Sequence, residues 1–286
     1  MIHDAIAQHI APIVSPERPP DSDHTAQGKP QDPVENVFQS RNKAKATVYH
    51  LRDVIRDRAS EGVTFRLRVP SLQISQGEKI ALIGESGCGK STLLDMLAFI
   101  SQPTELAAFR FRPELENDAV DVAKLWKRRR MNLLGDMRKR HIGYVMQTGG
   151  LLPYLTVREN MALSRVVLGL PRDDTVESLA RELGIARHLD KLPETLSVGE
   201  RQRVAIGRAL SHEPSIVIAD EPTASVDPFA AEKIMSLFIG LAEERNITVV
   251  VASHAWRHIK RLELRRLAHH THRSKDGRTT ETVVNG

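Results

Sequence analysis

Residues 84–92 read Gly-Glu-Ser-Gly-Cys-Gly-Lys-Ser-Thr, and this glycine-rich stretch constrains the fold more than any other part of the chain. It follows an apolar run at 79–83, which predicts a buried parallel strand, and it leads into 92–97, whose pattern predicts a helix. Glycines let the backbone curl closely around a phosphate, and the free N–H groups at the start of the helix point towards the anion. Lys90 adds a positive charge for the outer phosphates of a nucleotide, and the Ser91 hydroxyl is placed to coordinate Mg²⁺. A strand, a glycine-rich loop and a helix in this order therefore predict an α/β fold that binds a nucleotide.

The composition bounds what surrounds this loop. The chain has 286 residues, a length that fits one sizeable domain plus tails or two small domains. Because 41% of the residues are hydrophobic and only 4% aromatic, we expect a mostly aliphatic core. No stretch approaches the roughly 20 apolar residues needed to span a bilayer. The start of the chain lacks the basic and apolar regions of a signal peptide. Cys88 is the only cysteine, which excludes an intramolecular disulfide and fits a reducing cytoplasm.

The positive charge, +5 in total, is concentrated in a few segments. Residues 127–130 and 138–140 form two basic runs, and 261–275 is a third basic stretch. A solvated surface, a contact with anionic lipid headgroups and a contact with nucleic acid are all compatible with such runs. Aromatic residues are not interleaved with them, which counts against binding of single-stranded nucleic acid.

The first 44 residues differ in composition from the rest of the chain. They hold six of the 15 prolines among polar residues, so we expect a disordered tail at 1–44. Residues 46–51 and 63–69 alternate or carry β-branched side chains, which predicts two antiparallel strands, and 71–74 is a candidate third strand. The polar segment 101–140 gives no clear pattern, whereas 151–192 has helical spacing.

Strands and helices alternate in the last third of the chain. We expect helices at 199–210 and 228–244, and buried strands at 216–219 and 247–252. Such alternation predicts a parallel sheet with helices on its faces, and ligands bind such sheets at the carboxyl ends of the strands.

Two carboxylates follow one of these strands directly. Asp220 stands where it could hold Mg²⁺ close to the phosphate-binding loop. The next residue, Glu221, is placed to accept a proton from an attacking water, and a positioned base accelerates a reaction by roughly 10²–10⁴. An acidic pair at a strand end is commonly only a cap, so its significance depends on the loop that precedes it.

Residues 196–202, Leu-Ser-Val-Gly-Glu-Arg-Gln, resemble the signature motif of ATP-binding cassette (ABC) ATPases. Within this resemblance Gln147 matches the Q-loop, residues 225–227 match the D-loop and His254 matches the switch histidine, while Asp220 and Glu221 match the Walker B pair. The resemblance covers residues 46 to 283. It implies an ABC domain at 45–286 with a parallel-sheet core and helices on both faces, an antiparallel β subdomain, and a helical subdomain at about 151–210 that carries the signature. We expect residues 261–286 to form a basic C-terminal tail.

The resemblance also implies the chemistry and the partners. Two copies of such a chain close head to tail around two ATP–Mg²⁺, with the signature of one copy on the ATP of the other. The implied catalytic residues are Glu221, His254, Gln147 and Lys90. The implied nucleotide contacts are Gly84, Glu85, Ser86, Gly87, Cys88, Gly89, Lys90, Ser91, Thr92, Ser197, Gly199, Glu200 and Asp227. The implied Mg²⁺ ligands are Ser91, Gln147 and Asp220.

Shorter phrases narrow the resemblance. Residues 144–147, 151–153, 156–160 and 219–223 look like those of the subfamily that drives lipoprotein-releasing (Lol-type) and macrolide-exporting (Mac-type) systems. Its members pair with integral-membrane permeases, which implies a cytoplasmic protein held on the inner face of the cell membrane, and no nucleic-acid partner is expected. The alternative is a soluble ABC ATPase that acts on nucleic acid, ribosomes or a regulatory protein. ABC ATPases that act as translation factors usually carry two cassettes in one chain, and those that act in DNA repair usually carry a long coiled coil. The sequence shows neither feature.

Two positions depart from the pattern. Val198 stands where the signature usually has a glycine, although Ser197 and Gly199 are present. The aromatic residue expected to stack on adenine is not evident, and Arg58, Tyr49 and Phe65 are the candidates. An arginine could also stack through a cation–π contact, so the adenine contact stays open.

Overall fold

A computed structural model describes residues 46–60, 62–114, 116–254 and 260–286. The tail expected at 1–44 lies outside these residues. Within the described ranges, no helix is both long and apolar enough to cross a membrane.

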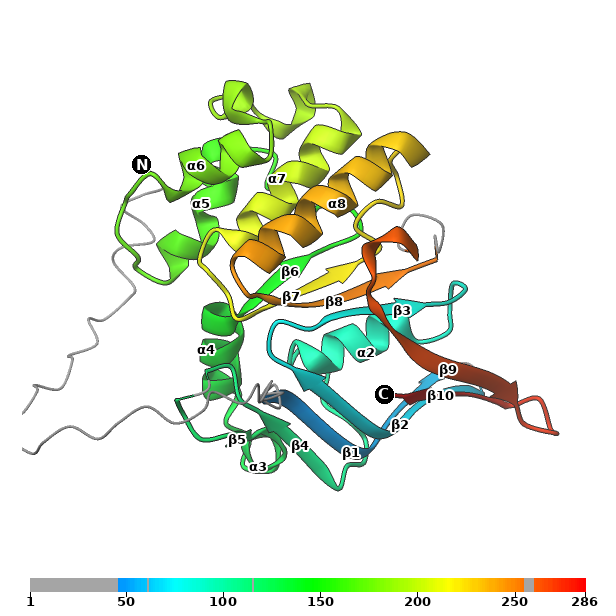
Figure 1. The fold of residues 1–286 in the computed structure, drawn as a ribbon. Coiled ribbons are helices and arrows are strands. Elements are labelled where there is room, and N and C mark those ends of the chain that lie inside the picture. The colour runs from blue at the N-terminus through cyan, green and yellow to red at the C-terminus, as the bar shows by residue number, and fades with distance from the viewer. Residues whose placement is uncertain (1–45, 61, 115, 255–259) are drawn as a thin grey trace, which may run out of the picture. The chain divides into compact units, whose positions relative to one another are not determined.

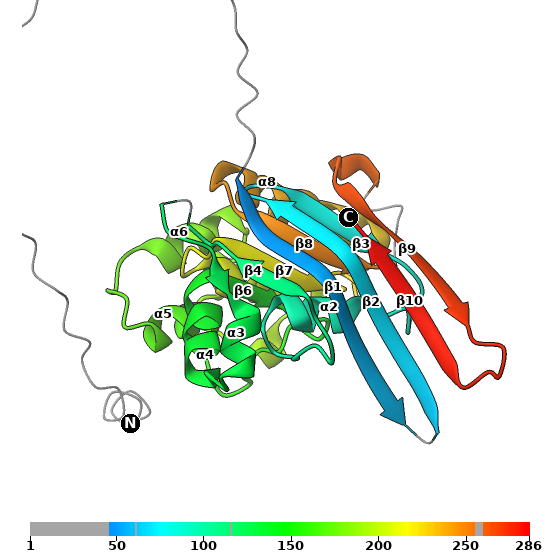
Figure 2. The ribbon, with the colours of Figure 1, turned by 90° about the horizontal axis from the view of Figure 1, so that it is seen from below.

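Ten strands of the described chain form one continuous sheet in the order β5-β4-β1-β2-β10-β9-β3-β8-β7-β6. One half is built on antiparallel pairs of β1 with β2 and β4, and in the other half β3, β8, β7 and β6 are parallel. Figure 2 shows the long β1–β2 hairpin running beside β9 and β10. The strands are β1 (Thr47–Ser60), β2 (Val63–Ser75), β3 (Lys79–Ile83), β4 (Ala108–Phe111), β5 (Val120–Asp121), β6 (Ile142–Val145), β7 (Ile216–Asp220), β8 (Thr248–Ser253), β9 (Arg265–Arg273) and β10 (Thr279–Asn285).

Helices cover both faces of the parallel half, as the sequence predicted. Because side chains alternate along a strand, Ile80 and Leu82 of β3 pack into one core and Ala81 and Ile83 into the other. Helices α5 to α8 cover the second face, and α2 lies between the first face and the antiparallel strands (Figure 1). The helices are α2 (Lys90–Leu97), α3 (Val122–Lys127), α4 (Met131–His141), α5 (Val157–Val167), α6 (Thr175–Glu182), α7 (Val198–Leu210) and α8 (Pro228–Glu244), with short 3-10 turns η1 (Ala186–His188), η2 (Pro193–Thr195) and η3 (Lys260–Leu262).

The segment 101–140, which had no clear pattern, forms β4, β5, α3 and α4 around an aromatic cluster. The ring centroids of Tyr49 and Phe111 are 4.9 Å apart, and those of Phe109 and Trp126 are 5.2 Å apart. The Tyr49 hydroxyl donates a hydrogen bond to the carbonyl of Leu97, 2.8 Å away. Five aromatic side chains thus pack in this layer, where they bury large rings against one another: Tyr49, Phe99, Phe109, Phe111 and Trp126.

Residues 265–285 do not form the basic tail that we predicted. They form the hairpin of β9 and β10, in which β10 pairs in parallel with β2 and β9 pairs in parallel with β3. The hairpin therefore joins the two halves of the sheet. Its strands are rich in Thr and His and bury only a few side chains, such as Leu267, Thr282 and Val284, so their apolar pattern was too weak to predict strands. The predicted third strand at 71–74 is the end of β2.

Candidate nucleotide-binding site

The glycine-rich loop connects β3 to α2, which begins at Lys90. Gly89, the N-cap of α2, has a φ of 89°, a left-handed conformation that favours glycine. A Cβ atom on Gly89 would lie 2.8 Å from the Phe65 ring, and one on Gly84 would lie 2.6 Å from Nε2 of His269. A side chain at either position would displace these neighbours, which approach the backbone of the loop from β2 and β9, and at Gly89 the left-handed φ favours glycine as well.

The Lys90 ammonium group is held inside the loop. The side chain is 6% exposed, and its Nζ donates to the carbonyls of Gly84 at 2.7 Å and Glu85 at 2.9 Å. The same Nζ lies 3.4 Å from Oε1 of Glu221. A buried charge needs such partners, because desolvation without them is costly. The positive charge is thus fixed where the loop would receive phosphate.

Glu221 and His254 form a hydrogen-bonded pair next to Lys90. Oε2 of Glu221 accepts from the backbone N–H of His254 at 3.1 Å and lies 2.8 Å from its Nδ1. Glu221 is 8% exposed and has a φ of 47°, and its own N–H donates to the carbonyl of Ala252. The turn after β7 therefore directs the carboxylate back over the sheet edge, towards the loop.

Asp220 and Gln147 lie at the same edge of the sheet. Asp220 ends β7, and Gln147 follows β6, whose Val145 pairs with Ala219 of β7. Oδ1 of Asp220 is buried and has no hydrogen-bond partner among the described residues. The carboxyl ends of β3, β6, β7 and β8 thus bring the glycine-rich loop, the Asp220–Glu221 pair, Gln147 and His254 to one edge of the sheet.

The signature residues stand at the start of α7. Ser197 is the N-cap: its hydroxyl accepts from the N–H of Glu200, and the Glu200 carboxylate accepts from the N–H of Ser197 at 2.9 Å. These hydrogen bonds with Ser197 lower the pKa of Glu200 to about 2, and the neighbouring His188 acts in the same direction. The sequence predicted a nucleotide contact for Glu200, and its carboxylate here caps α7. That contact stays a prediction.

The signature and the D-loop share a surface hollow of about 440 Å³ between α7 and α8. Ser197, Val198 and Gly199 line it from one side, and Ser225 and Asp227 line it from the other. Asp227 is the N-cap of α8 and accepts from the N–H of Ala230 at 3.0 Å. No residue of the glycine-rich loop lines this hollow. The hollow at the signature is therefore distinct from the glycine-rich loop.

Sequence reasoning missed one neighbour of the loop and left another undecided. His269 carried no sequence signal for the loop, yet it lies against Gly84, because alternate residues of β9 point to opposite faces. His270 and His272 point away and stack on each other, and the described residues contain no cluster suited to a metal ion. Phe65, one of three adenine candidates, lies against Gly89.

The sequence model of the family described as "ABC transporter" matches residues 67–224, more than half of the chain. The chain belongs to the ABC transporter family. Its cassette is an ATPase of the ABC type, with the fold that the resemblance predicted.

Similar proteins share most of this cassette. The lipoprotein-releasing system ATP-binding protein LolD of Aquifex aeolicus (strain VF5) is 37% identical over 217 residues, which are 75% of this chain and 89% of that protein. The macrolide export ATP-binding/permease protein MacB of Rhodopirellula baltica is 35% identical over 218 residues, or 74% of this chain but only 29% of that longer protein.

A solved ABC transporter cassette has the same fold. The dimeric structure of the bacterial cassette MJ0796 is 30% identical, with a TM-score of 0.60, and the match covers 74% of this chain and 90% of that one. A second structure of MJ0796 is bound to ADP and phosphate. These relatives confirm the predicted family and its likeness to the Lol-type and Mac-type subfamily.

Proposed function

We propose that this cassette is the nucleotide-binding subunit of a membrane ABC transporter and that two copies close around two ATP molecules. The observation that carries the proposal is the separation of the glycine-rich loop from the hollow lined by Ser197 and Asp227. Within one copy the loop does not line the hollow at the signature, and in this proposal a second copy supplies its signature to the nucleotide that the loop binds. The exposed start of α7, which favours negative charge, would then face the partner's γ-phosphate.

The residues at the sheet edge support in-line hydrolysis of the γ-phosphate. Glu221 takes a proton from the attacking water while the water oxygen bonds to the γ-phosphorus. The bond between that phosphorus and the oxygen that stays with ADP breaks. His254, bonded to Glu221, orients that carboxylate. Lys90 exchanges its loop carbonyls for phosphate oxygens and stabilises their charge.

A magnesium ion fits the same edge. Oδ1 of Asp220 is buried and accepts no hydrogen bond among the described residues. Carboxylate oxygens are the ligands that Mg²⁺ prefers. Asp220, Ser91 and Gln147 would hold the ion, which supplies neutralisation of the phosphate charge.

We also assign the adenine contact to Phe65. Tyr49 is fully buried in the aromatic cluster and cannot present a ring to a nucleotide. Arg58 pairs with Phe65 across the β1–β2 hairpin, but its guanidinium lies 3.7 Å from the carboxylate of Asp95. Phe65 is a partly exposed aromatic side chain against the loop itself. Stacking of a base on such a ring contributes roughly 1–3 kcal/mol.

The surface after β6 would pass the closing motion to a permease. Met146 and Tyr154 are 48% and 64% exposed beside Gln147 and the start of α5, and they offer apolar surface to a partner. Because similar cassettes are named for lipoprotein release and macrolide export, we propose a permease of that kind. The cassette would then sit on the cytoplasmic face of the membrane.

The test is Glu221→Gln. We expect this variant to bind ATP and form stable dimers in light scattering while its turnover falls to about 1% or less, because the base is lost. Tagged Glu221→Gln, purified from membranes in mild detergent with ATP and Mg²⁺, should bring a permease with it, identified by mass spectrometry. Glu213→Gln, a change at an exposed site, is the matched control and should behave as wild type. Near-normal turnover of Glu221→Gln would remove Glu221 from the role of base, and a soluble partner in place of a permease would contradict the transporter assignment.

A further inference from the structure

The turn between α3 and α4 exposes an unusual mixture of charge and apolar surface. We call residues 127–133 the basic corner, in which every residue is exposed. Met131 is 53% and Leu133 is 48% exposed. The side chains of Arg128, Arg129 and Arg130 make no ion pair or hydrogen bond within the described chain. The corner therefore offers unpaired positive charge next to apolar side chains.

The two basic runs differ in how they relate to α4. Residues 138–140 stand in its last turn, where cations stabilise the negative end of the helix dipole. Arg138 also donates to the carbonyl of Phe99, and Lys139 pairs with Asp136 at 2.7 Å. This second run therefore has an ordinary structural role.

Residues 128–130 form the turn from the end of α3, whose C-cap is Arg128, to the start of α4. Arg130 is the N-cap and makes no capping hydrogen bond, and the first turn contains no acidic residue. Cations at this end oppose the dipole of α4, although they complement that of α3, whose last carbonyls accept from the N–H groups of the same residues. Neither helix pairs the three side chains, so their charge is free for an external anionic partner.

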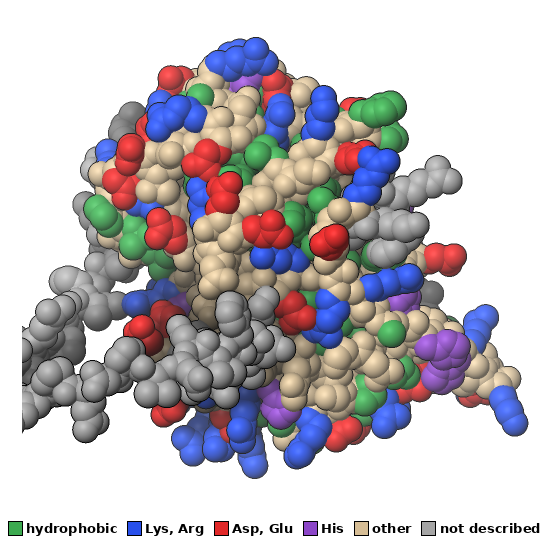
Figure 3. Space-filling view, viewed as in Figure 1, with side chains coloured by type: hydrophobic (Ala, Val, Ile, Leu, Met, Phe, Trp, Pro, Cys, Tyr) green, Lys and Arg blue, Asp and Glu red, His purple; other side chains and the backbone are tan. Residues whose placement is uncertain are grey.

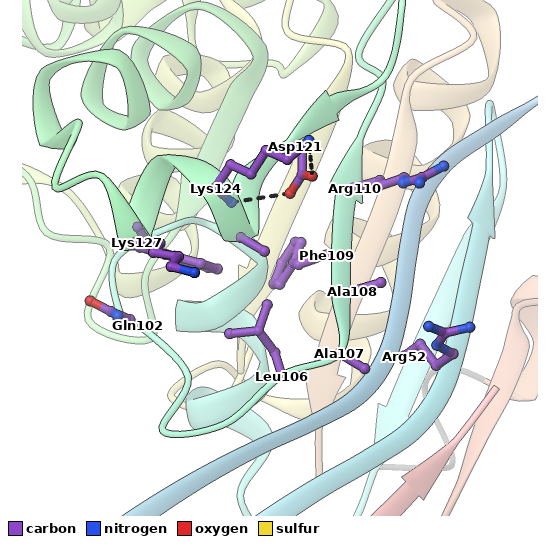
Figure 4. Close-up of a pocket in the computed structure, with 12 residues that line it drawn as sticks. Arg52, Gln102, Leu106, Ala107, Ala108, Phe109, Arg110, Asp121, Lys124 and Lys127 are labelled. Carbon is purple, nitrogen blue, oxygen red and sulfur yellow. Dashed lines mark hydrogen bonds and ion pairs between the residues drawn. The ribbon is translucent and has the colours of Figure 1, made fainter.

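The distribution of charge around the corner decides the shape of that partner. A hollow of about 500 Å³ lies between α3 and the strands β1 and β4. In Figure 4, Lys127 lies on one side of it, while Arg52 and Arg110 lie on the other and extend away. Lys124 is occupied by Asp121 at 3.3 Å. The cations do not converge on one point, as a compact phosphate would require.

Basic side chains instead spread over the surface. Figure 3 shows Lys and Arg side chains along the lower edge of the molecule, below β1, β4 and α3. An extended anionic surface matches this pattern, either a bilayer or a nucleic acid. Met131 and Leu133 favour the bilayer over the nucleic acid, because apolar side chains among arginines can enter the boundary between headgroups and acyl chains. The nearby rings of Phe109 and Trp126 are buried and cannot stack on bases.

We propose that the basic corner docks on a membrane surface that contains anionic phospholipids. Arg128, Arg129 and Arg130 pair with headgroup phosphates, and Met131 and Leu133 enter the boundary between headgroups and acyl chains. Helix α4 runs directly into β6 and Gln147 follows that strand, so the lipid contact lies close in the chain to the surface proposed for the permease. The lipid contact does not depend on the permease and is testable without it.

The experiment is sedimentation of the purified full chain with vesicles of phosphatidylcholine alone or with 30–50% phosphatidylglycerol. We expect binding only to the anionic vesicles, weakening steeply as salt shortens the Debye length. Each basic residue near such a surface contributes about five-fold in affinity (about 1 kcal/mol), so Arg128→Gln/Arg129→Gln/Arg130→Gln should bind on the order of 100-fold more weakly. Met131→Ser/Leu133→Ser should bind about five-fold more weakly, because less apolar surface is buried.

The matched control is Arg181→Gln/Lys191→Gln/Lys275→Gln, which removes three exposed cations elsewhere in the chain. It should keep vesicle binding within about three-fold of wild type. All three variants should keep wild-type ATPase activity in solution, which shows that they are folded and separates this test from that of Glu221.

Three results would overturn the proposal: no binding of wild type to anionic vesicles at low salt, an equal loss in the control variant, or no loss in the arginine variant. Tighter binding of duplex DNA than of anionic vesicles, lost in the arginine variant, would assign the corner to nucleic acid instead.

Discussion

Two buried side chains at the site carry opposite charges that compensate each other. Lys90 and Glu221 are both less than 10% exposed and lie 3.4 Å apart. Removing one partner of a buried ion pair leaves the other charge uncompensated. At the residue scale, the sheet edge is therefore a coupled unit, and a substitution there tests stability as well as chemistry. Two residues outside this pair allow cleaner tests.

Phe65 tests the adenine contact. Phe65→Leu keeps apolar packing against Gly89 but removes the aromatic face, so we expect the Kd for ATP to rise about ten-fold, within the roughly 1–3 kcal/mol of a base stack. Phe65→Trp should retain wild-type affinity. Arg58→Ala is the comparison for the other candidate and should change the Kd by less than about three-fold. Fluorescent-nucleotide titration measures all three, and a normal Kd in Phe65→Leu would exclude stacking on this ring.

His212 tests the link between burial and pH. Burial lowers its pKa from 6.5 to about 4, and the neighbouring charges of His141 and Arg165 act in the same direction. In the unfolded chain the His212 imidazole binds a proton near pH 6.5, whereas in the folded chain it stays neutral down to about pH 4. The unfolding free energy therefore falls as the pH drops from 7 towards 4. The unfolding free energy of the wild type should fall between pH 7.5 and pH 5, and we expect that fall to be about 2 kcal/mol smaller in His212→Gln. Urea unfolding at both pH values measures this difference, and parallel pH profiles of variant and wild type would contradict it.

The helical region shows how one element is held by its entry loop. Asn160 of α5 is fully buried, and its Oδ1 accepts from the N–H of Leu152 at 2.8 Å. Its Nδ2 donates to the carbonyls of Leu152, Leu155 and Thr156 at 2.9–3.0 Å. A single side chain thus fixes the segment between Gln147 and α5, the surface proposed to meet the permease.

Replacing Asn160 should loosen that element. Asn160→Ala leaves buried backbone groups unpaired, each costing about 1–3 kcal/mol, so we expect the unfolding free energy to fall by about 2–4 kcal/mol. Asn132→Ala, at an exposed position of α4, is the control and should change it by less than about 0.5 kcal/mol. Denaturant unfolding measures both variants. A loss below 1 kcal/mol in Asn160→Ala would show that the loop is held by other contacts.

At the scale of the whole molecule, the hairpin of β9 and β10 connects the antiparallel and parallel halves of the sheet. Strand β10 pairs with β2 over five residue pairs, from Thr279 with Thr64 to Val283 with Arg68. On the other side of the hairpin, β9 pairs with β3, the strand that leads into the glycine-rich loop. The last residues of the chain therefore support the first elements of the nucleotide site.

Truncation tests this connection. A chain that ends at residue 264 lacks β9 and β10 and exposes the edges of β2 and β3, so we expect no cooperative thermal unfolding and extensive aggregation. A chain that begins at residue 44 is the matched control, because the compact unit spans residues 44 to 286. It should unfold with a Tm within a few degrees of wild type. Calorimetry measures both, and a cooperative transition in the first would show that the halves fold without the hairpin.

The residues that carry the chemistry, and the elements that present them, could be predicted from local sequence patterns. The glycine-rich loop, the acidic pair and His254 each follow a strand with a strong local pattern, so their positions at the strand ends could be predicted. Local rules suffice there, because capping, apolar runs and glycine conformations act over a few neighbouring residues.

Only the tertiary structure decided what lies against those residues. The contacts of Phe65 and His269 with the loop, the Lys90–Glu221 pair and the place of β9 and β10 inside the sheet all join residues far apart in the chain. Strand pairing and close approach depend on register and on the packing of whole layers, which a weakly apolar hairpin does not reveal. The identity of the site was therefore local information, whereas its shape and charge balance came from long-range packing.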